Sequence, residues 1–518
     1  MADSTYQLIA QQAQARPAAL ALMQQDQVLN YAELQQQITQ WAAGLIALGL
    51  QVDQRVAIYL PKQLSAVCAI WAVMGAGGIV VPINPVLKPA QVRHILQDSG
   101  AMLLITHQAR AYGLLDTLVG CLELCHVILT DVAPSPNSTW SFSVHSLAVL
   151  QQAMPQPLPQ RVATDQAAIL YTSGSTGLAK GVVLSHANLV LGAASVVSYL
   201  HNTAQDRLLA VLPLSFDYGL SQLTSAFTVG ASVVLLDYLV PQDVVQAVVR
   251  YRITGLAAVP SLWQKLAHLT WPAVPHLRYL TNSGGTLPVT YVRALQQALP
   301  DTAVYLMYGL TEAFRATYLP PEQLAQRPDA IGKPVPYAQL QVLNTSGKPC
   351  GTNEPGELVQ SGPLVAQGYW GDPSISAHTF RRLPGQVNQA LSVWSGDWVR
   401  QDAEGYLYFI GRRDAMIKTA GYRVSPDEIE TQVQRLSCVT LAVAQGVPQA
   451  ELGQMIVLWI QGTGSLSVIR AHCQQYLPNY MQPQDYILLP EIPLNPNGKP
   501  DRSALKRDYL AAQGRQTI

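Results

Sequence analysis

Charged side chains are scarce in this chain of 518 residues, because Lys, Arg, Asp and Glu together make up only 12% of it. The 32 basic and 32 acidic residues cancel to a formal net charge of zero. Nucleic-acid binding needs a basic patch or run, and the sequence contains none. We therefore expect no nucleic acid among the partners of this protein.

Cysteine is also rare, with six residues in the whole chain. The only close pair, Cys121 and Cys125, has no second pair and no histidine at the spacing of metal ligands. Buried, reduced thiols are expected, which favours the cytoplasm as the compartment. The N-terminal segment MADSTYQLIAQQAQARP has no basic stretch followed by an apolar core, so we expect no secretory signal.

Long apolar runs are missing too. No charge occurs between Lys62 and Lys88, but this segment contains helix-breaking residues at Gly75, Gly77, Gly78, Pro82 and Pro85. The pattern predicts a buried helix, a glycine turn and a short strand, and no membrane insertion.

What the sequence does contain is an alternation of helical and strand patterns. Asn30 and Glu33 form a capping pair before a helical pattern that ends near Gly49. Repeated βα units with almost entirely apolar strands indicate parallel sheets covered on both faces. The length is too great for one core, so three or four units, or one large body and a smaller domain, are expected. The strands and helices of further βα units are predicted in the segments RVAIYL, LSAVCAIWAVMGA, GGIVVPI, VRHILQDSG, AMLLIT, VVQAVVRYR and ITGLAAVP.

The pattern changes after Tyr337 to short strands and turns, for which we predict a small β-barrel-like part. A compact mixture of helices and strands follows Asp414. The predicted fold class is α/β, with a large domain over residues 1–411, a boundary at 412–414 and a small α+β domain over 415–518.

The stretch YTSGSTGLAKGV, Tyr171 to Val182, is rich in glycine and hydroxyl groups and contains one lysine. Such a segment can present N–H and O–H groups to an anion, which predicts a phosphate-binding loop. A flexible Ser/Gly linker is the alternative. The stretch is not a Walker loop, because Ala179 stands where glycine is required before Lys180. No dinucleotide-binding fingerprint is present either, since Val80 takes the place of its third glycine.

This loop resembles the signature loop of the adenylate-forming superfamily, which includes acyl-CoA synthetases, carrier-protein acyl ligases and nonribosomal peptide adenylation domains. The family usually has proline at the position of Ala179 and threonine at that of Ser395. The match is closest to AMP-forming acyl ligases found with exosortase systems. The resemblance continues, in family order over almost the whole chain, through the segments PLSFDYG (213–219), NSGGTL (282–287), MYGLTE (307–312), WSGDWV (394–399), GRRDAMIKTAGYRVSPDEIE (411–430) and PNGKPDR (496–502).

The resemblance implies activation of a carboxylic acid by ATP to an acyl-adenylate, followed by displacement of AMP by a thiol. It implies that Lys499 contacts the α-phosphate and the attacking carboxylate, that Thr311 contacts the α-phosphate, and that Glu312 holds Mg²⁺. Asp397 and Arg412 would bind the ribose. The remaining nucleotide contacts implied are Thr172, Ser173, Gly174, Ser175, Thr176, Gly177 and Lys180 for the pyrophosphate, and Gly284, Gly285 and Tyr308 for the nucleoside.

In the same family the small domain rotates between the two half-reactions about a hinge residue, to which Asp414 corresponds. Gly421 would then lie beside the thiol tunnel, where the lack of a side chain leaves room for a phosphopantetheine arm. His186 is expected to be a capping or core histidine rather than a catalytic one.

The acid pocket is indicated by four residues. Asp217 matches the aspartate with which amino-acid adenylation domains bind an ammonium group, although it could instead cap a helix. Arg315 falls at a pocket position and could pair with Asp217 or bind a second carboxylate. Ser283 would assist as a neutral donor, and Trp263 is either the far wall of the pocket or a core residue.

The resulting prediction is an ATP- and Mg²⁺-dependent ligase for an amino acid, a β-amino acid or an amino-dicarboxylic acid. The acceptor would be an acyl carrier protein in trans or coenzyme A. Two alternatives stay open: an acyl-CoA synthetase for an apolar acid, and a non-catalytic nucleotide-binding scaffold.

Overall fold

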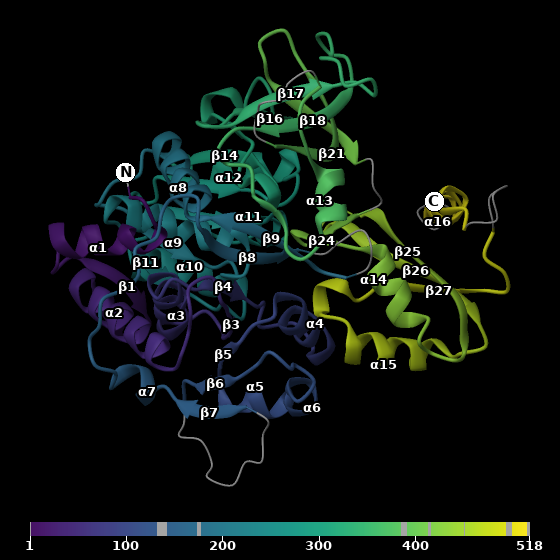
Figure 1. The fold of residues 1–518 in the computed structure, drawn as a ribbon. Helices are drawn as coiled ribbons and strands as arrows, with labels where there is room; N and C mark the ends of the chain where they lie inside the picture. Colours follow the sequence, from purple (N-terminus) through teal and green to yellow (C-terminus); the bar gives the residue numbers. More distant parts are fainter. Residues whose placement is uncertain are drawn as a thin grey trace.

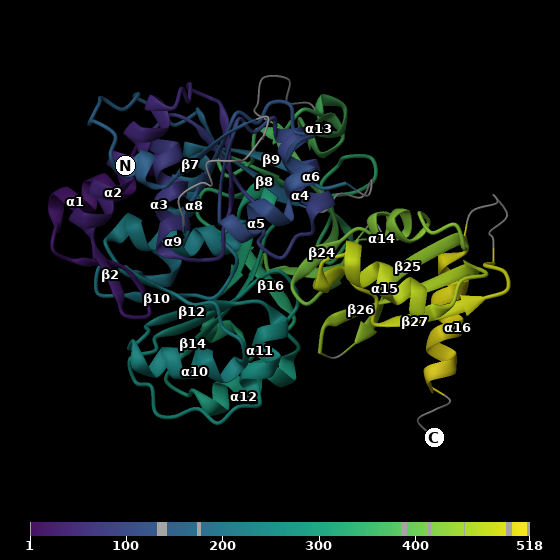
Figure 2. The same cartoon turned by 90° about the horizontal axis from the view of Figure 1, so that it is seen from below.

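The computed structural model describes residues 2–131, 142–172, 178–384, 391–412, 416–449, 451–493 and 500–514. Strands within these residues form three sheets, two in a large body and one in a smaller body beside it (Figures 1 and 2). We call residues 2–412 the N-terminal part and residues 416–514 the C-terminal part. The expected α/β class with a large N-terminal and a small C-terminal domain is confirmed.

The first sheet of the N-terminal part has the order β7-β6-β5-β3-β4-β8-β9-β19. Its strands are parallel from β7 to β8, and β9 then pairs antiparallel with β8. The parallel strands β4 and β5 are buried along their whole length, as their continuous apolar sequences require. The strands are β3 (Arg55–Tyr59), β4 (Ile79–Pro82), β5 (Leu103–Thr106), β6 (His126–Leu129), β7 (Ser143–Ser146), β8 (Gln166–Thr172), β9 (Lys180–Ser185) and β19 (Gly368–Tyr369).

The second sheet has a parallel centre, formed by β1, β11, β10, β12, β13 and β14. Antiparallel strands extend it beyond β14, and the first of them, β15 and β16, precede the change to short strands and turns after Tyr337. The strands are β1 (Leu20–Gln24), β2 (Gln27–Asn30), β10 (Arg207–Ala210), β11 (Ser232–Leu235), β12 (Gly255–Ala258), β13 (Tyr279–Asn282), β14 (Ala303–Tyr308), β15 (Thr317–Leu319), β16 (Ala330–Pro334), β17 (Gln339–Leu343), β18 (Gly356–Ser361), β20 (Phe380–Arg381), β21 (Ser392–Gln401) and β22 (Leu407–Arg412).

The third sheet, in the C-terminal part, is mainly antiparallel, and β27 joins β26 in parallel. Helices α14 and α15 lie on this sheet, and α16 lies at the end of the C-terminal part (Figures 1 and 2). The elements are β23 (Ile417–Thr419), β24 (Tyr422–Val424), α14 (Pro426–Val433), β25 (Val439–Gln449), β26 (Gly453–Gly462), α15 (Leu466–Tyr476), the 3₁₀ turn η3 (Asn479–Met481), β27 (Asp485–Leu489) and α16 (Arg502–Gly514).

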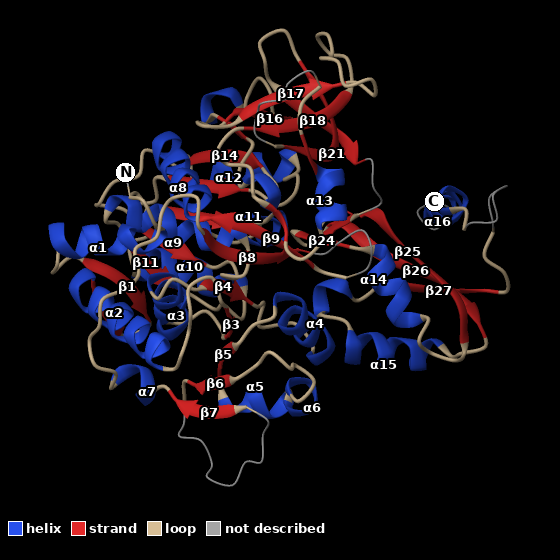
Figure 3. Ribbon diagram, viewed as in Figure 1, coloured by secondary structure: helices blue, strands red, loops and turns tan. Residues whose placement is uncertain are grey.

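Helices cover the faces of the two large sheets (Figure 3). The predicted capping box is present at α2, where Asn30 accepts a hydrogen bond from the Glu33 amide and Glu33 accepts one from that of Asn30. The helices are α1 (Thr5–Ala15), α2 (Tyr31–Ala47), α3 (Leu64–Gly75), α4 (Pro89–Ser99), α5 (Gln108–Gly113), α6 (Leu115–Leu118), α7 (Ala148–Gln151), α8 (His186–Leu200), α9 (Asp217–Val229), α10 (Pro241–Arg250), α11 (Pro260–Ala267), α12 (Val289–Ala298) and α13 (Pro373–Thr379), with the 3₁₀ turns η1 (Thr311–Ala313) and η2 (Pro321–Gln323).

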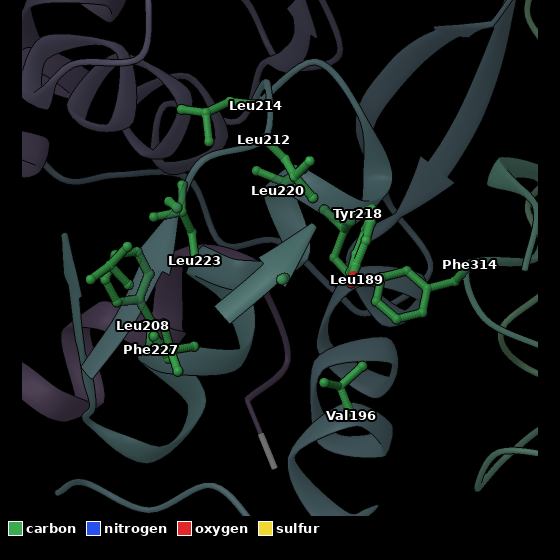
Figure 4. Close-up of a cluster of buried hydrophobic side chains, with 14 of the residues drawn as sticks. Leu189, Val196, Leu208, Leu212, Leu214, Tyr218, Leu220, Leu223, Phe227 and Phe314 are labelled. Atoms are coloured by element: carbon green, nitrogen blue, oxygen red, sulfur yellow. The ribbon is translucent and has the colours of Figure 1, made fainter. Parts of the chain in front are cut away.

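The main core fills the space between these helices and sheets. Figure 4 shows a section of it, with apolar side chains from α8, β10 and α9 around Tyr218 and Phe314. The cysteines are free, and burial raises the pKa of the Cys68 thiol to about 12. Among the described residues, no helix is both long and apolar enough to span a bilayer.

Candidate active site

A cavity of about 350 Å³ lies at the carboxyl ends of the parallel strands β13 and β14. This edge of an open parallel sheet is where ligands bind most often, because the loops that follow the strands converge there. Its lining includes Thr172 at the end of β8, Asp397 on β21 and the turn after β13. The C-terminal part closes one side with Lys418, Gly421, Tyr422, Arg423 and Tyr480.

Asp217 and Arg315 form an ion pair in the cavity wall. Asp217 is the first residue of α9, and its Oδ2 lies 3.2 Å from Arg315 Nη1. The hydroxyl of Thr311 lies 3.4 Å from the other carboxylate oxygen. Burial raises the pKa of Asp217, and Arg315 partly offsets this effect. Phe216 is the N-cap of this helix and makes no side-chain capping hydrogen bond.

The guanidinium of Arg315 is fixed by several further contacts. It donates to the carbonyl oxygen of Phe314 and, at 3.3 Å, to Ser221 Oγ, and it lies 4.5 Å from the ring centre of Tyr218. The residue is 2% exposed, and its Nε has no hydrogen-bond partner among the described residues. A buried donor of this kind is a place where a polar ligand atom would be stabilised.

Phe314 has an unusual backbone conformation, with φ 59° and ψ −86°. A bulky residue at positive φ is strained, so the surrounding packing must hold it there. Its ring packs on α8 at Gly192, where an added Cβ would come within 2.7 Å of the ring. This packing fixes the direction of the chain between Glu312 and Arg315.

The turn after β13 provides part of the cavity wall. Ser283, Gly284 and Gly285 line it, and Ser283 is 2% exposed. Trp263 does not belong to the lining. Its indole is buried in the core and donates to the carbonyl oxygens of Ala258 and Thr281. The prediction that Trp263 bounds the far wall of the pocket is therefore wrong, and the residue takes the alternative position in the core.

Tyr308 and Asp397 meet on the other side of the cavity. The Tyr308 hydroxyl donates to Asp397 Oδ2, and Asp397 is 2% exposed. The Asp397 amide donates to Ser395 Oγ, which in turn donates to the carbonyl of Leu358. Arg412 lies opposite Asp397 in the β21–β22 register, and its side chain lies outside the described part of the chain.

Glu312 and Lys180 are joined through Tyr369. The Tyr369 hydroxyl donates to Glu312 Oε1 at 2.8 Å, and Lys180 Nζ lies 5.6 Å from the centre of the same ring. Tyr369 is placed there because β19 pairs with β9, which begins at Lys180. Burial and the Glu312 carboxylate both raise the pKa of Tyr369. Oε2 of Glu312 is buried and accepts no hydrogen bond from the described residues.

The loop around Gly421 packs against the N-terminal part. Gly421 has φ +84°, and an added Cβ would lie 2.6 Å from Val259 Cβ. Ser261 donates to the Ala420 carbonyl at 3.1 Å. Tyr422 makes an edge contact with Phe216 and stacks on Tyr480 with 3.8 Å between ring centres. The C-terminal part therefore presents this loop directly to the cavity.

Seven predicted site residues, Ser173, Gly174, Ser175, Thr176, Gly177, Asp414 and Lys499, lie outside the described residues. His186 is a fully buried core residue, with Nδ1 3.1 Å from Thr5 Oγ1, as one of the two expectations had it. Four further residues, Lys418, Tyr422, Arg423 and Tyr480, line the cavity although no motif predicted them there. The first three lie inside the quoted 411–430 segment, whereas nothing local to Tyr480 indicated a site.

Comparison with known proteins identifies the family. The profile described as "AMP-binding enzyme" matches residues 9–370, and "AMP-binding enzyme C-terminal domain" matches residues 428–499. The chain belongs to the AMP-binding enzyme family. It is 32% identical to an L-proline–[L-prolyl-carrier protein] ligase of Streptomyces coelicolor, over 93% of this chain and 92% of that one. It is 30% identical to a linear gramicidin synthase of Brevibacillus parabrevis, over 96% of this chain but only 6% of that much longer protein.

One similar protein has been solved in two ligand-bound forms. With the o-succinylbenzoate CoA synthetase of Bacillus subtilis, a double mutant bound to its product analogue OSB-NCoA, the TM-score is 0.84 at 25% identity, covering 96% and 98% of the two chains. With the same synthetase bound to its acyl-adenylate intermediate the TM-score is 0.70, over 96% and 97%. The present arrangement of the AMP-binding enzyme is thus nearer to the product-analogue form.

Proposed function

We propose that this AMP-binding enzyme activates an amino acid with ATP and transfers the acyl group to a phosphopantetheine thiol. A carboxylate oxygen of the acid attacks the α-phosphorus and pyrophosphate leaves. The thiol sulfur then attacks the acyl carbonyl, AMP leaves, and the thiol proton passes to solvent. The observation that carries the proposal is one cavity with the Asp217–Arg315 pair on one side, the Tyr308–Asp397 pair on another, and the Gly421 loop closing it.

The first step brings two anions together, so catalysis needs positive charge and donors placed in advance. Asp397 is suited to accept from the two ribose hydroxyls, since a carboxylate has two acceptor oxygens. Thr311, between Asp217 and Glu312, is positioned for the α-phosphate. Lys499 supplies the cation for the transition state, and residues 172–180 bind the departing pyrophosphate.

Mg²⁺ fits the site through Glu312. Its Oε2 is buried without a hydrogen bond from the described residues, and Mg²⁺ in nucleotide sites is bound by one or two carboxylates together with phosphate oxygens and waters. The ion, when bound, neutralises phosphate charge. Tyr369 holds the other carboxylate oxygen and so fixes the direction in which Glu312 presents Oε2.

The Asp217–Arg315 pair supports the proposed substrate class. Asp217 would bind the ammonium group of an amino-dicarboxylic or β-amino acid, and Arg315 would bind the second carboxylate that only the dicarboxylic acid carries. Each buried charge would then gain a partner of opposite sign from the ligand. We propose a carrier protein in trans as the thiol donor, in line with the proline ligase, and coenzyme A as the alternative acceptor.

The function is tested by acid-dependent exchange between ATP and labelled pyrophosphate over proteinogenic, β- and dicarboxylic amino acids and fatty acids. Lys499→Ala should lower exchange by at least about 10²-fold, while supplied acyl-adenylate is still converted to thioester. Lys348→Ala, on a distant turn, is the control. Exchange with no amino acid, or full exchange in Lys499→Ala, would overturn the proposal.

A further inference from the structure

Outside the cavity, one polar contact joins helix α4 of the N-terminal part to helix α14 of the C-terminal part. Gln91 Nε2 donates to Glu428 Oε1 at 3.0 Å and lies 3.6 Å from Met481 Sδ. Gln91 is itself oriented by the start of α4, because its Oε1 accepts from the Lys88 amide at 3.1 Å. The two residues are 337 positions apart in the chain, and Figure 1 shows α4 facing α14 and α15 across the boundary.

The Glu428 carboxyl is enclosed by this contact. Oε2 is buried and has no hydrogen-bond partner among the described residues. The groups that face it are Gln91 from α4 and, from η3, Tyr480 and Met481. Glu430, on the same helix, pairs with Arg502 instead. No cation from the described residues contributes to the environment of Glu428.

An ionised carboxylate in such a place keeps one oxygen desolvated without a donor, which is costly. A protonated carboxyl avoids this cost and still accepts from Gln91. Burial accordingly raises the pKa of Glu428 to about 7, and Gln91 only partly opposes it.

We propose that Gln91 and Glu428 form a latch that positions the C-terminal part for thiol transfer, and that the latch closes by taking up a proton from solvent. This inference rests on the proposed function, because it assigns the present arrangement to the second half-reaction. Tyr480 links the latch to the cavity, since it adjoins Met481, which contacts Gln91, and stacks on Tyr422 beside Gly421. Opening the boundary would return Glu428 to water and to its ordinary pKa.

The sign of the pH effect follows from linkage. The closed arrangement binds the Glu428 proton more tightly than the open one. The resulting stabilisation of the closed arrangement is complete below the ordinary glutamate pKa and is lost as the pH rises through about 7. With pKa values of about 7 closed and 4.5 open, the closed-to-open ratio falls about tenfold between pH 6 and pH 8. The raised pKa values of Tyr422 and Tyr480 keep both phenols neutral over this range.

Glu428→Gln tests the latch, because the amide keeps the shape and an acceptor oxygen but does not titrate. Thioester formation from supplied acyl-adenylate should have similar rates in both proteins at pH 6, and the variant should be faster than the wild type at pH 8, by up to about tenfold. The ratio of the two rates at each pH cancels the effect of thiol ionisation, which is the same for both proteins. Glu451→Gln, an exposed site of the C-terminal part, should show a flat ratio. A flat ratio for Glu428→Gln overturns the latch.

Hydrogen exchange of the α4 amides and of residues 420–424 provides a second readout that needs no substrate. Protection in Glu428→Gln should match the wild type at pH 6 and exceed it at pH 8. In Gln91→Met, the loss of amide protection should occur at a higher pH than in the wild type, since the substitution removes the one donor that favours the Glu428 carboxylate. Equal protection at both pH values in all proteins overturns the latch. If no acid supports pyrophosphate exchange, the proposed function is overturned, but the hydrogen-exchange test of the latch remains valid because it needs no substrate.

Discussion

Arg315 Nη1 lies 3.2 Å from Asp217 Oδ2, and the two side chains are 2% and 15% exposed. Two charges removed from water in this way cost desolvation energy that their attraction offsets only when the geometry is good. Under the proposed function, the pair would act as a preformed receptor for a ligand that carries both an ammonium group and a second carboxylate.

Arg315→Leu should abolish pyrophosphate exchange with an amino-dicarboxylic acid and allow a plain amino acid to be used. A site built on polar pairing rejects an analogue that lacks one partner by about 10⁴-fold. Asp217→Asn should weaken the binding of every substrate that carries an amine. Arg250→Leu, which removes an exposed pair with Asp26, should leave exchange unchanged. A wild-type preference for a medium-chain fatty acid, with both pocket variants nearly neutral, would reduce the pair to a structural role.

Asp397→Asn should raise the KM for ATP without a matching change in the KM for the acid. A hydrogen bond to a charged group contributes about 1.5 to 3 kcal/mol, which corresponds to about 10- to 150-fold. Tyr308→Phe should have a smaller effect, about fivefold, because it only removes the donor that orients Asp397. Steady-state kinetics with each substrate varied in turn would decide the matter, and equal rises in both KM values would contradict a ribose contact.

Gly421→Ala should slow thioester formation and spare pyrophosphate exchange. The new Cβ would come within 2.6 Å of Val259 Cβ and could be accommodated only if the loop withdrew from the cavity. Gly371→Ala is the matched control, since Gly371 also has positive φ but no atom within 4 Å of its added Cβ. Equal loss in the two variants would mean that backbone strain, and not closure of the loop, is responsible.

Asp414→Pro should separate the half-reactions at the hinge. Proline fixes φ near about −65° and limits rotation at this position. When both are measured on the same preparation, pyrophosphate exchange should persist and thioester formation should be lost. Loss of both, with a lowered melting temperature, would indicate misfolding.

Local patterns in the sequence predicted much of the fold. Apolar strands such as β4 and β5, and the Asn30–Glu33 capping box, are determined by neighbouring residues, and they form as expected. Asp217 and Arg315 were assigned to one pocket from the family resemblance, and the structure brings the two side chains together.

Contacts between distant segments could not be predicted in this way. Tyr369 reaches Glu312 across 57 positions because β19 pairs with β9, and neither short strand has a distinctive pattern. Trp263 could be assigned to the core or to the pocket only once the carbonyl groups that accept from its indole were known. The positive φ of Phe314 could not be predicted from the sequence either, because bulky residues almost never adopt this conformation.

The packing of Phe314 on Gly192 couples the position of Arg315 to α8, a helix that contributes no residue to the cavity lining. A larger side chain at 192 would displace the ring, and the guanidinium of the next residue would move with it. Evolution or engineering of a new acid specificity in this protein must therefore treat positions 192, 314 and 315 as one unit, since a substitution at 315 alone would inherit a backbone shaped for arginine.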